Sequence, residues 1–248
     1  MEARSLHPWR VGYREAVAIQ ESLRARLRLR PLPARVRLVA GTDVAYSRPT
    51  HRMYAAVVVV ALPSLKVVEV AEAHCRARFP YVPGLFTFRE LPPLLRAFRR
   101  LRSRPHVLLF DGQGLAHPRR FGLACHGGLL LGRPSVGCAK SRLVGAHAPL
   151  GAERGASAEL AFDGRVVGAA LRTQRGVKPV YVSPGHRADV RTSVDLVLAC
   201  TGRFRLPEPT RLAHQATTAL RRRLDPTLEP ARIRSYPDFR PSAAAIRR

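Results

Sequence analysis

The chain has 248 residues and a mass of 27.4 kDa, and 46% of its residues are hydrophobic, which suits one large globular domain. Its longest apolar run, residues 55–62, is too short to span a bilayer. The four cysteines form no CxxC pair. The sequence therefore predicts neither a membrane protein nor a zinc site or disulfide framework.

The charge of the chain predicts a polyanionic partner. There are 43 Lys and Arg against 17 Asp and Glu, a formal net charge of +26. Neutralising phosphates releases counterions, so nucleic acid is favoured over a membrane surface or an effect on solubility alone. Only three of the cations are lysines, so genome-wide codon usage can account for part of the excess. The first residues include no apolar stretch typical of a signal peptide, and we expect a cytoplasmic protein.

The first half of the chain predicts a helix followed by three strands. Apolar residues at helical spacing predict a helix over residues 11–30, ending at two prolines. Valine-rich runs that start at residue 36, residue 53 and residue 65 predict an antiparallel meander. A helical pattern follows over residues 85–98, and we expect Pro92 and Pro93 to restart that helix.

The second half alternates strands and helices. A short apolar run ending at Phe110 predicts a buried parallel strand. Residues 145–164 have few apolar anchors and are predicted to form a loop. The remaining elements are a helix at 121–131, strands at 135–139, 166–172 and 179–183, a helix capped by Asp189, and a last helix from Pro209.

Three antiparallel strands followed by alternating helices and strands predict an α/β fold, with a mixed sheet covered by helices on both faces. We find no internal repeat or linker, so residues 1–230 are expected to form one domain that includes the N-terminal helix. Residues 231–248 form a basic tail that we expect to be mobile.

Carboxylates stand out in so basic a chain. Asp43 lies in the first predicted strand, Glu90 on the following helix and Asp111 at the end of the next strand. If they converge beside the sheet, they form the oxygen-rich site that Mg²⁺ or Mn²⁺ prefers together with substrate phosphates, which suits phosphodiester hydrolysis. Taken singly, Asp43 can be a turn or bulge residue and Glu90 part of a solvated helix face; Asp111 can simply begin an Asp-Gly turn.

Blocks of sequence along residues 36–220 together resemble the endonuclease V family, the inosine-specific repair nucleases with an RNase H-like fold. The blocks are VAGTDVAY at 39–46, PYVPGL at 80–85, FRE at 88–90, DGQG at 111–114, AHPRR at 116–120, GCAKS at 137–141, KPVYVSPGHR at 178–187, VDL at 194–196 and LPEPTRLAH at 206–214.

The resemblance implies roles for individual residues. Asp43, Glu90 and Asp111 match the family's metal-binding acids. Lys140 matches a basic residue near the scissile phosphate, and His214 matches a further active-site position. Taken alone, Lys140 is more simply a surface lysine, and His214 an ordinary packed or surface histidine.

The resemblance also implies a binding site for a flipped base. Pro80, Tyr81, Val82 and Pro83 resemble the wedge that fills the gap left by the extruded base, and stiff prolines beside a flat aromatic ring suit that role. Without the resemblance this stretch is a rigid surface turn. Backbone groups near four further residues are expected to read the base edge, namely Gly84, Leu85, Gly112 and Gly122. His117 is left open between a phosphate contact and shaping of the base pocket.

The function expected from this resemblance is a Mg²⁺-dependent DNA repair endonuclease that hydrolyses the second phosphodiester bond 3′ to deoxyinosine, leaving 3′-hydroxyl and 5′-phosphate ends. Two alternatives remain: a ribonuclease acting on inosine-containing RNA, and a non-catalytic basic protein that binds nucleic acid. We expect a monomer with no membrane partner.

Overall fold

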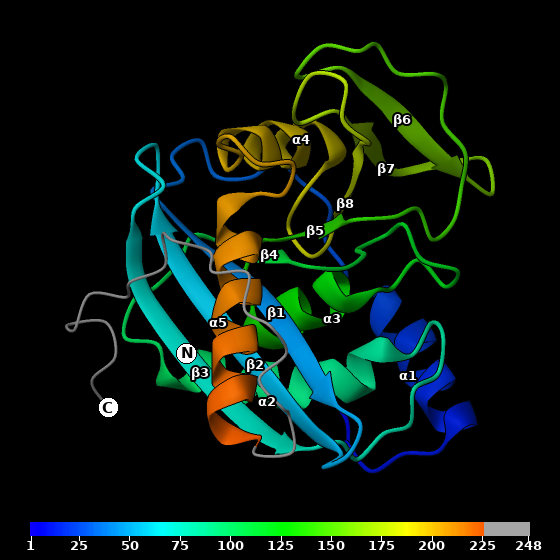
Figure 1. The fold of residues 1–248 in the computed structure, drawn as a ribbon. Helices are drawn as coiled ribbons and strands as arrows, with labels where there is room; N and C mark the ends of the chain where they lie inside the picture. Colours follow the sequence, from blue (N-terminus) through cyan, green and yellow to red (C-terminus); the bar gives the residue numbers. More distant parts are fainter. Residues whose placement is uncertain (226–248) are drawn as a thin grey trace.

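The computed structural model describes residues 1–225, which are built around one eight-stranded mixed sheet (Figure 1). The strand order is β3-β2-β1-β4-β5-β8-β7-β6. Strands β1, β2 and β3 form the predicted antiparallel meander, β4 and β5 run parallel to β1, and β8, β7 and β6 continue the sheet in antiparallel pairs. The strands are β1 (Leu38–Ser47), β2 (Arg52–Ala61), β3 (Val67–Arg76), β4 (Val107–Phe110), β5 (Ser135–Ala139), β6 (Ser157–Phe162), β7 (Arg165–Leu171) and β8 (Val180–Pro184).

Helices cover both faces of the sheet, as predicted. Alternation along β4 divides the core, because Leu108 and Phe110 pack toward α2 and α3 whereas Val107 and Leu109 pack toward α4 and α5. In Figure 1, α5 crosses the sheet on the near side and α2 and α3 lie behind it. The helices are α1 (Tyr13–Arg24), α2 (Phe86–Arg100), α3 (Leu123–Leu131), α4 (Val190–Ala199) and α5 (Glu208–Leu224).

The prediction of a loop over residues 145–164 is wrong for the second half of that range, which contains β6. This edge strand buries only Leu160 completely, so its sequence lacks a clear apolar run. It pairs with β7 through the two-residue turn Asp163-Gly164, in which both residues have positive φ (49° and 66°). Asp-Gly is a strong signal for this hairpin turn, and it was the clue in the sequence.

Two helix predictions also need correction. Helix α2 runs without a break through Pro92 and Pro93, because the apolar side chains on either side hold it against the sheet despite the missing N–H donors. Helix α1 ends at Arg24, six residues early. Beyond it the chain is fixed by long-range contacts: the Arg187 N–H donates to the Arg28 carbonyl at 2.6 Å, and the Leu32 N–H donates to Thr192 Oγ1 at 3.0 Å.

No helix within residues 1–225 has the length and apolar character needed to cross a membrane. The predicted basic tail, residues 231–248, lies outside the described residues.

Candidate active site

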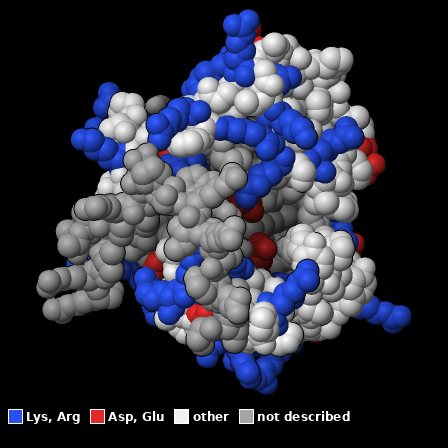
Figure 2. Space-filling model, viewed as in Figure 1, with Lys and Arg blue, Asp and Glu red and all other residues white. Residues whose placement is uncertain are grey.

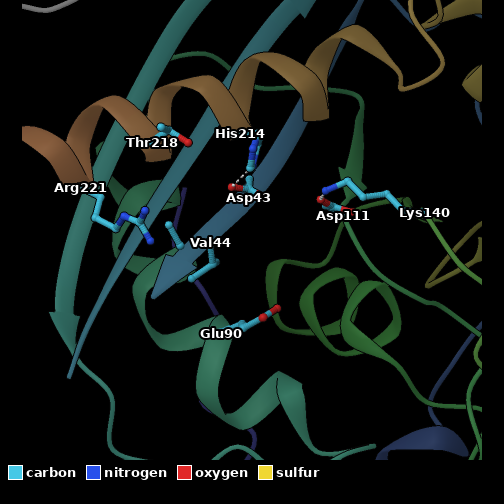
Figure 3. Close-up of a pocket in the computed structure, with 9 residues that line it drawn as sticks. Asp43, Val44, Glu90, Asp111, Lys140, His214, Thr218 and Arg221 are labelled. Carbon is cyan, nitrogen blue, oxygen red and sulfur yellow. Dashed lines mark hydrogen bonds and ion pairs between the residues drawn. The ribbon is translucent and has the colours of Figure 1, made fainter. Parts of the chain in front are cut away.

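Two of the predicted acids are neighbours because of the register between strands. Strand β1 pairs in parallel with β4, and Thr42 lies opposite Phe110. The next residues along the two strands are Asp43 and Asp111. Asp43 lies within β1, whereas β4 ends just before Asp111, so both carboxyl groups lie near the carboxyl end of β4 (Figure 3).

Helix α5 supplies the partners of Asp43. A side chain on Gly41 would collide with Pro209, since its Cβ would lie 2.1 Å from the Pro209 carbonyl carbon, and this lets α5 lie directly on β1. His214 Nδ1 donates to Asp43 Oδ2 at 3.3 Å, and Thr217 Oγ1 donates to the same oxygen at 2.5 Å. Burial favours the neutral acid, but these two hydrogen bonds outweigh it and hold the pKa of Asp43 below its usual value. The bond to Asp43 also raises the pKa of His214.

Lys140 forms an ion pair with Asp111. Its Nζ lies 2.5 Å from Asp111 Oδ2, and the lysine follows directly after β5, the strand beside β4. Burial alone would lower the pKa of Lys140, but the Asp111 carboxylate raises it, so the ammonium stays charged. The pKa of Asp111 is raised by burial and by Asp43, with Lys140 acting in the opposite direction.

Glu90 approaches the same site from helix α2, on the other face of the sheet (Figure 3). Burial and the carboxylates of Asp43 and Asp111 raise the pKa of Glu90 to about 8. All five predicted catalytic residues line one cavity of about 530 Å³. Within residues 1–225, however, no three Asp, Glu, His or Cys side chains are close enough together to hold one ion.

The cavity lies in a basic surface. Figure 2 shows Lys and Arg side chains gathered around a hollow, with acidic side chains at its base. Arg221 lines the cavity and donates from its Nη1 to the Tyr46 carbonyl at 3.2 Å. Its Nε is buried and has no hydrogen-bond partner among the described residues. A second cation, Arg89, stacks 4.1 Å from the centre of the Tyr46 ring. The surroundings therefore suit a phosphate backbone more than a neutral ligand.

A second cavity of about 240 Å³ adjoins the first, because Glu90 and Asp111 line both. Four of the residues predicted to contact the flipped base line this second cavity, namely Gly84, Gly112, His117 and Gly122. Leu85 is not among its lining residues. Its side chain is fully buried with Phe79 and Phe88, and its N–H donates to the Val82 carbonyl at 2.9 Å.

The Gly84 carbonyl is held by three donors. Gln20 Nε2 donates to it at 3.1 Å, His117 Nε2 at 3.0 Å and Arg119 Nη2 at 2.6 Å. Gly84 has φ of +77°, which glycine adopts without strain, and an added Cβ would lie 2.9 Å from Arg119 Nη2. Gln20 is completely buried on α1, also donates to the Phe121 carbonyl and accepts from Arg119 Nε at 2.6 Å. We call Gln20, His117 and Arg119 the Gly84 clamp; it fixes the wall of the second cavity.

The hydrogen bonds of the Gly84 clamp bear on the two roles predicted for His117, a phosphate contact and shaping of the base pocket. Its Nε2 donates to a carbonyl, so its Nδ1 carries no proton and accepts from the Arg119 N–H at 3.2 Å. Burial, followed by the charge of Arg119, lowers the pKa of His117 to about 4. The histidine is therefore neutral near pH 7, and both of its ring nitrogens are hydrogen-bonded within the wall of the second cavity.

The four residues of the predicted wedge lie in the turn before α2. Tyr81 is 65% exposed, and its ring meets only the edge of the Phe86 ring, with the centroids 4.7 Å apart. Pro80 and Pro83 are also exposed, whereas Val82 packs partly against the cluster around Phe79. The aromatic face of Tyr81 is therefore accessible next to Phe86, which lines the second cavity.

Several residues of the site were not predicted from the sequence. Thr217, Thr218 and Arg221 follow His214 by three, four and seven residues, so helical periodicity places them on the same face of α5 and was the signal available. Gln20 offered no comparable signal, because its partners lie 64 and more residues away in the chain.

Comparisons with known proteins show the family of the chain. Residues 21–215 match the family model described as Endonuclease V. An Endonuclease V of Myxococcus xanthus is 52% identical over 86% of this chain and 92% of its own length. The crystal structure of the Endonuclease V from Streptomyces avermitilis is 42% identical, covers 90% of this chain and 99% of its own, and gives a TM-score of 0.84.

A third relative is an Endonuclease V of Ciona intestinalis, solved in complex with DNA containing an inosine followed by a ribo-adenosine. It is 27% identical, covers 86% of this chain and 98% of its own, and gives a TM-score of 0.76. The match to the family model and the extent of these alignments lead to one conclusion: the chain belongs to the endonuclease V family, and it is a nuclease.

Proposed function

We propose that this nuclease is a Mg²⁺-dependent DNA repair enzyme that hydrolyses the second phosphodiester bond 3′ to deoxyinosine, leaving 3′-hydroxyl and 5′-phosphate ends. The observation that carries the proposal is the shared wall of the two cavities. Glu90 and Asp111 line both the charged cavity, which suits phosphate chemistry, and the glycine-lined cavity, which suits a base. A nuclease that cuts beside an extruded base needs the two sites next to each other.

The acids of the charged cavity are suited to holding a divalent metal ion. Asp43, Glu90 and Asp111 offer only oxygen donors, the ligands that Mg²⁺ and Mn²⁺ take together with substrate phosphate oxygens. Burial and the neighbouring carboxylates raise the pKa of Glu90 to about 8, and a bound cation would favour its ionised form. Because no three acids are within reach of one ion, binding requires side chains to move. When bound, the metal would activate water and stabilise charge on the phosphate.

The chain's own residues would do the remaining work. Lys140 and Arg221 can contact the phosphate and offset its developing charge. His214 and Thr217 orient the Asp43 carboxylate through hydrogen bonds. Tyr81 can stack on the bases left behind by the extruded nucleotide, and the Gly84 clamp keeps the pocket in shape for it.

A nicking assay tests the proposal. The protein is incubated with a duplex carrying a single deoxyinosine, with Mg²⁺, Mn²⁺ or EDTA, and the cut is mapped. We expect a cut at the second phosphodiester bond 3′ to the lesion that disappears in EDTA and in a matched duplex with adenine. Absence of any metal-dependent cut would contradict the proposal and would favour a non-catalytic basic protein that binds nucleic acid.

Inosine-containing RNA is the second candidate substrate. The relative from Ciona intestinalis was crystallised with an inosine followed by a ribo-adenosine, so a 2′-hydroxyl next to inosine is compatible with binding in that protein. Rates on matched inosine-containing DNA and RNA strands separate the two substrates. A kcat/KM at least tenfold higher on RNA would make the ribonuclease the better description.

A further inference from the structure

Two arginines line a small cavity at the opposite end of β5 from the active site, and three more arginines lie close to one of them. The cavity has a volume of about 200 Å³ and is lined by Arg30, Pro31, Pro33, Pro134 and Arg187. Pro134 precedes β5 and Lys140 follows it, so this site and the active site are separated by the length of that strand, about 20 Å for six residue steps. It therefore shares no residue with either cavity described above.

Three more arginines join the two that line the cavity. The Arg187 N–H donates to the Arg28 carbonyl at 2.6 Å, and Arg187 Nη1 donates to the Gly132 carbonyl at 3.1 Å. Arg133 is the next residue after Gly132. The guanidinium of Arg4 comes from the N-terminal segment, and its Nη2 would lie 3.4 Å from a Cβ built on Gly132. We call Arg4, Arg28, Arg30, Arg133 and Arg187 the arginine cluster.

The arginine cluster lacks anionic partners. Within residues 1–225, none of its members forms an ion pair with a carboxylate. The Nε of Arg187 is buried there without a hydrogen-bond partner. Arg187 also has a positive φ of 53°, a conformation that costs free energy in a residue other than glycine. Like charges are thus gathered here with no carboxylate among residues 1–225 paired to offset them.

The charges of the cluster act on one another. The pKa of Arg187 is lowered by burial and then by the other four arginines. Burial, followed by the charges of Arg187 and of three other arginines of the cluster, lowers the pKa of His186 to about 4. That histidine is therefore neutral near pH 7, and its Nδ1 can accept from the Arg28 N–H at 3.4 Å. The site therefore has an excess of hydrogen-bond donors with positive charge, held by a backbone that three prolines stiffen.

We propose that the arginine cluster is a binding site for a phosphate group, distinct from the catalytic site. Planar guanidinium groups donate pairs of hydrogen bonds that match phosphate oxygens, and several of them around one cavity favour a multiply charged anion over a carboxylate. The phosphate can come from a free oligophosphate or nucleotide, or from a nucleic acid strand extending beyond the active site. This inference does not depend on the proposed nuclease mechanism.

Calorimetric titration with tripolyphosphate at physiological ionic strength tests the proposal. The wild-type protein should bind it saturably, and the double variant Arg30→Gln/Arg133→Gln should bind it at least about tenfold more weakly, since two charged donors are lost. The matched control Arg99→Gln/Arg165→Gln removes the same charge from exposed arginines elsewhere and should stay within about twofold of wild type. Lys140→Gln, which alters the active site, should also bind normally.

The outcomes are distinct. No saturable binding by wild type, or an equal loss in both double variants, overturns the proposal, because the second result reflects net charge alone. Loss of binding in Lys140→Gln but not in Arg30→Gln/Arg133→Gln also overturns it, because the probe would then occupy the active site. Circular dichroism and the melting temperature establish that the variants are folded. Competition by an oligothymidylate without inosine identifies a nucleic acid source; unchanged tripolyphosphate binding in its presence identifies a free phosphate.

Discussion

The two adjoining cavities of the active site are built in opposite ways. The charged cavity presents carboxylates, a lysine and a histidine whose pKa values depend strongly on one another. The second cavity is walled by glycines and by a neutral histidine, and the Gly84 carbonyl accepts from all three residues of the Gly84 clamp. Cleavage requires charges that respond to substrate and metal, whereas discrimination between bases requires fixed donors and acceptors. The difference predicts how substitutions in each cavity behave.

The largest effect is expected in the charged cavity. Asp111→Asn should lower kcat for nicking inosine DNA by about 100- to 1,000-fold or more, as loss of a group that stabilises the transition state does. Binding of the same DNA in EDTA should persist, because the base pocket is intact. The control is Asp195→Asn, an exposed acid on α4, which should nick normally. Full Mg²⁺-dependent nicking by Asp111→Asn would remove this residue from the catalytic set.

A smaller effect is expected at the predicted wedge. Tyr81→Ala should weaken kcat/KM on inosine DNA by about 10- to 100-fold, the range expected for loss of one aromatic stacking contact. Its melting temperature should not change, because Tyr81 is 65% exposed. Tyr13→Ala, a tyrosine on α1 that is 60% exposed, serves as the matched control. Equal activity of the two variants would mean that Tyr81 belongs to a surface turn and does not stack on the substrate.

The Gly84 clamp should affect selectivity more than rate. Gln20→Leu removes two donors and one acceptor from the wall of the second cavity, so we expect the preference for inosine over adenine to fall about tenfold while kcat on inosine falls less. Unfolding in urea should show a loss of about 1–3 kcal/mol, because the Phe121 carbonyl loses its Gln20 donor and Arg119 Nε loses its acceptor. Glu21→Gln, its exposed neighbour, is the control. A loss of stability with unchanged selectivity would reduce Gln20 to a purely structural residue.

The smallest effect on nicking is expected from the buried histidines, which instead make the folding stability depend on pH. The pKa of His117 is about 4, and burial holds the pKa of His126 well below its usual value, whereas the unfolded chain protonates both near pH 6.5. Between these values the unfolded state binds more protons, so stability should fall as the pH drops from about 6.5 to 4, by about 3 kcal/mol for His117 alone. Urea unfolding measured at several pH values checks this.

A pair of variants isolates the contribution of the buried histidine. His126→Gln should flatten the dependence of stability on pH between about 6.5 and 4, because it removes one of the groups that resist protonation. His147→Gln, at a half-buried histidine outside the core, is the control. An unchanged slope in His126→Gln would mean that His126 is protonated in the folded protein.

The sequence alone determined the antiparallel meander, the buried strand before Asp111 and the N-cap at Asp189, because these depend on local periodicity and on short-range signals. It missed β6, whose edge position leaves little apolar character, although Asp163-Gly164 marked its turn. The resemblance to endonuclease V rested on many separate blocks, and the family match confirms it.

Tertiary structure decided what surrounds the acids. Parallel pairing of β1 with β4 sets Asp43 beside Asp111, and the contact of Pro209 with Gly41 lays α5 over them. The Gly84 clamp and the arginine cluster could not be predicted, because each joins residues far apart in the chain. Such groupings leave no periodic trace in the sequence, since they depend on how whole elements pack together.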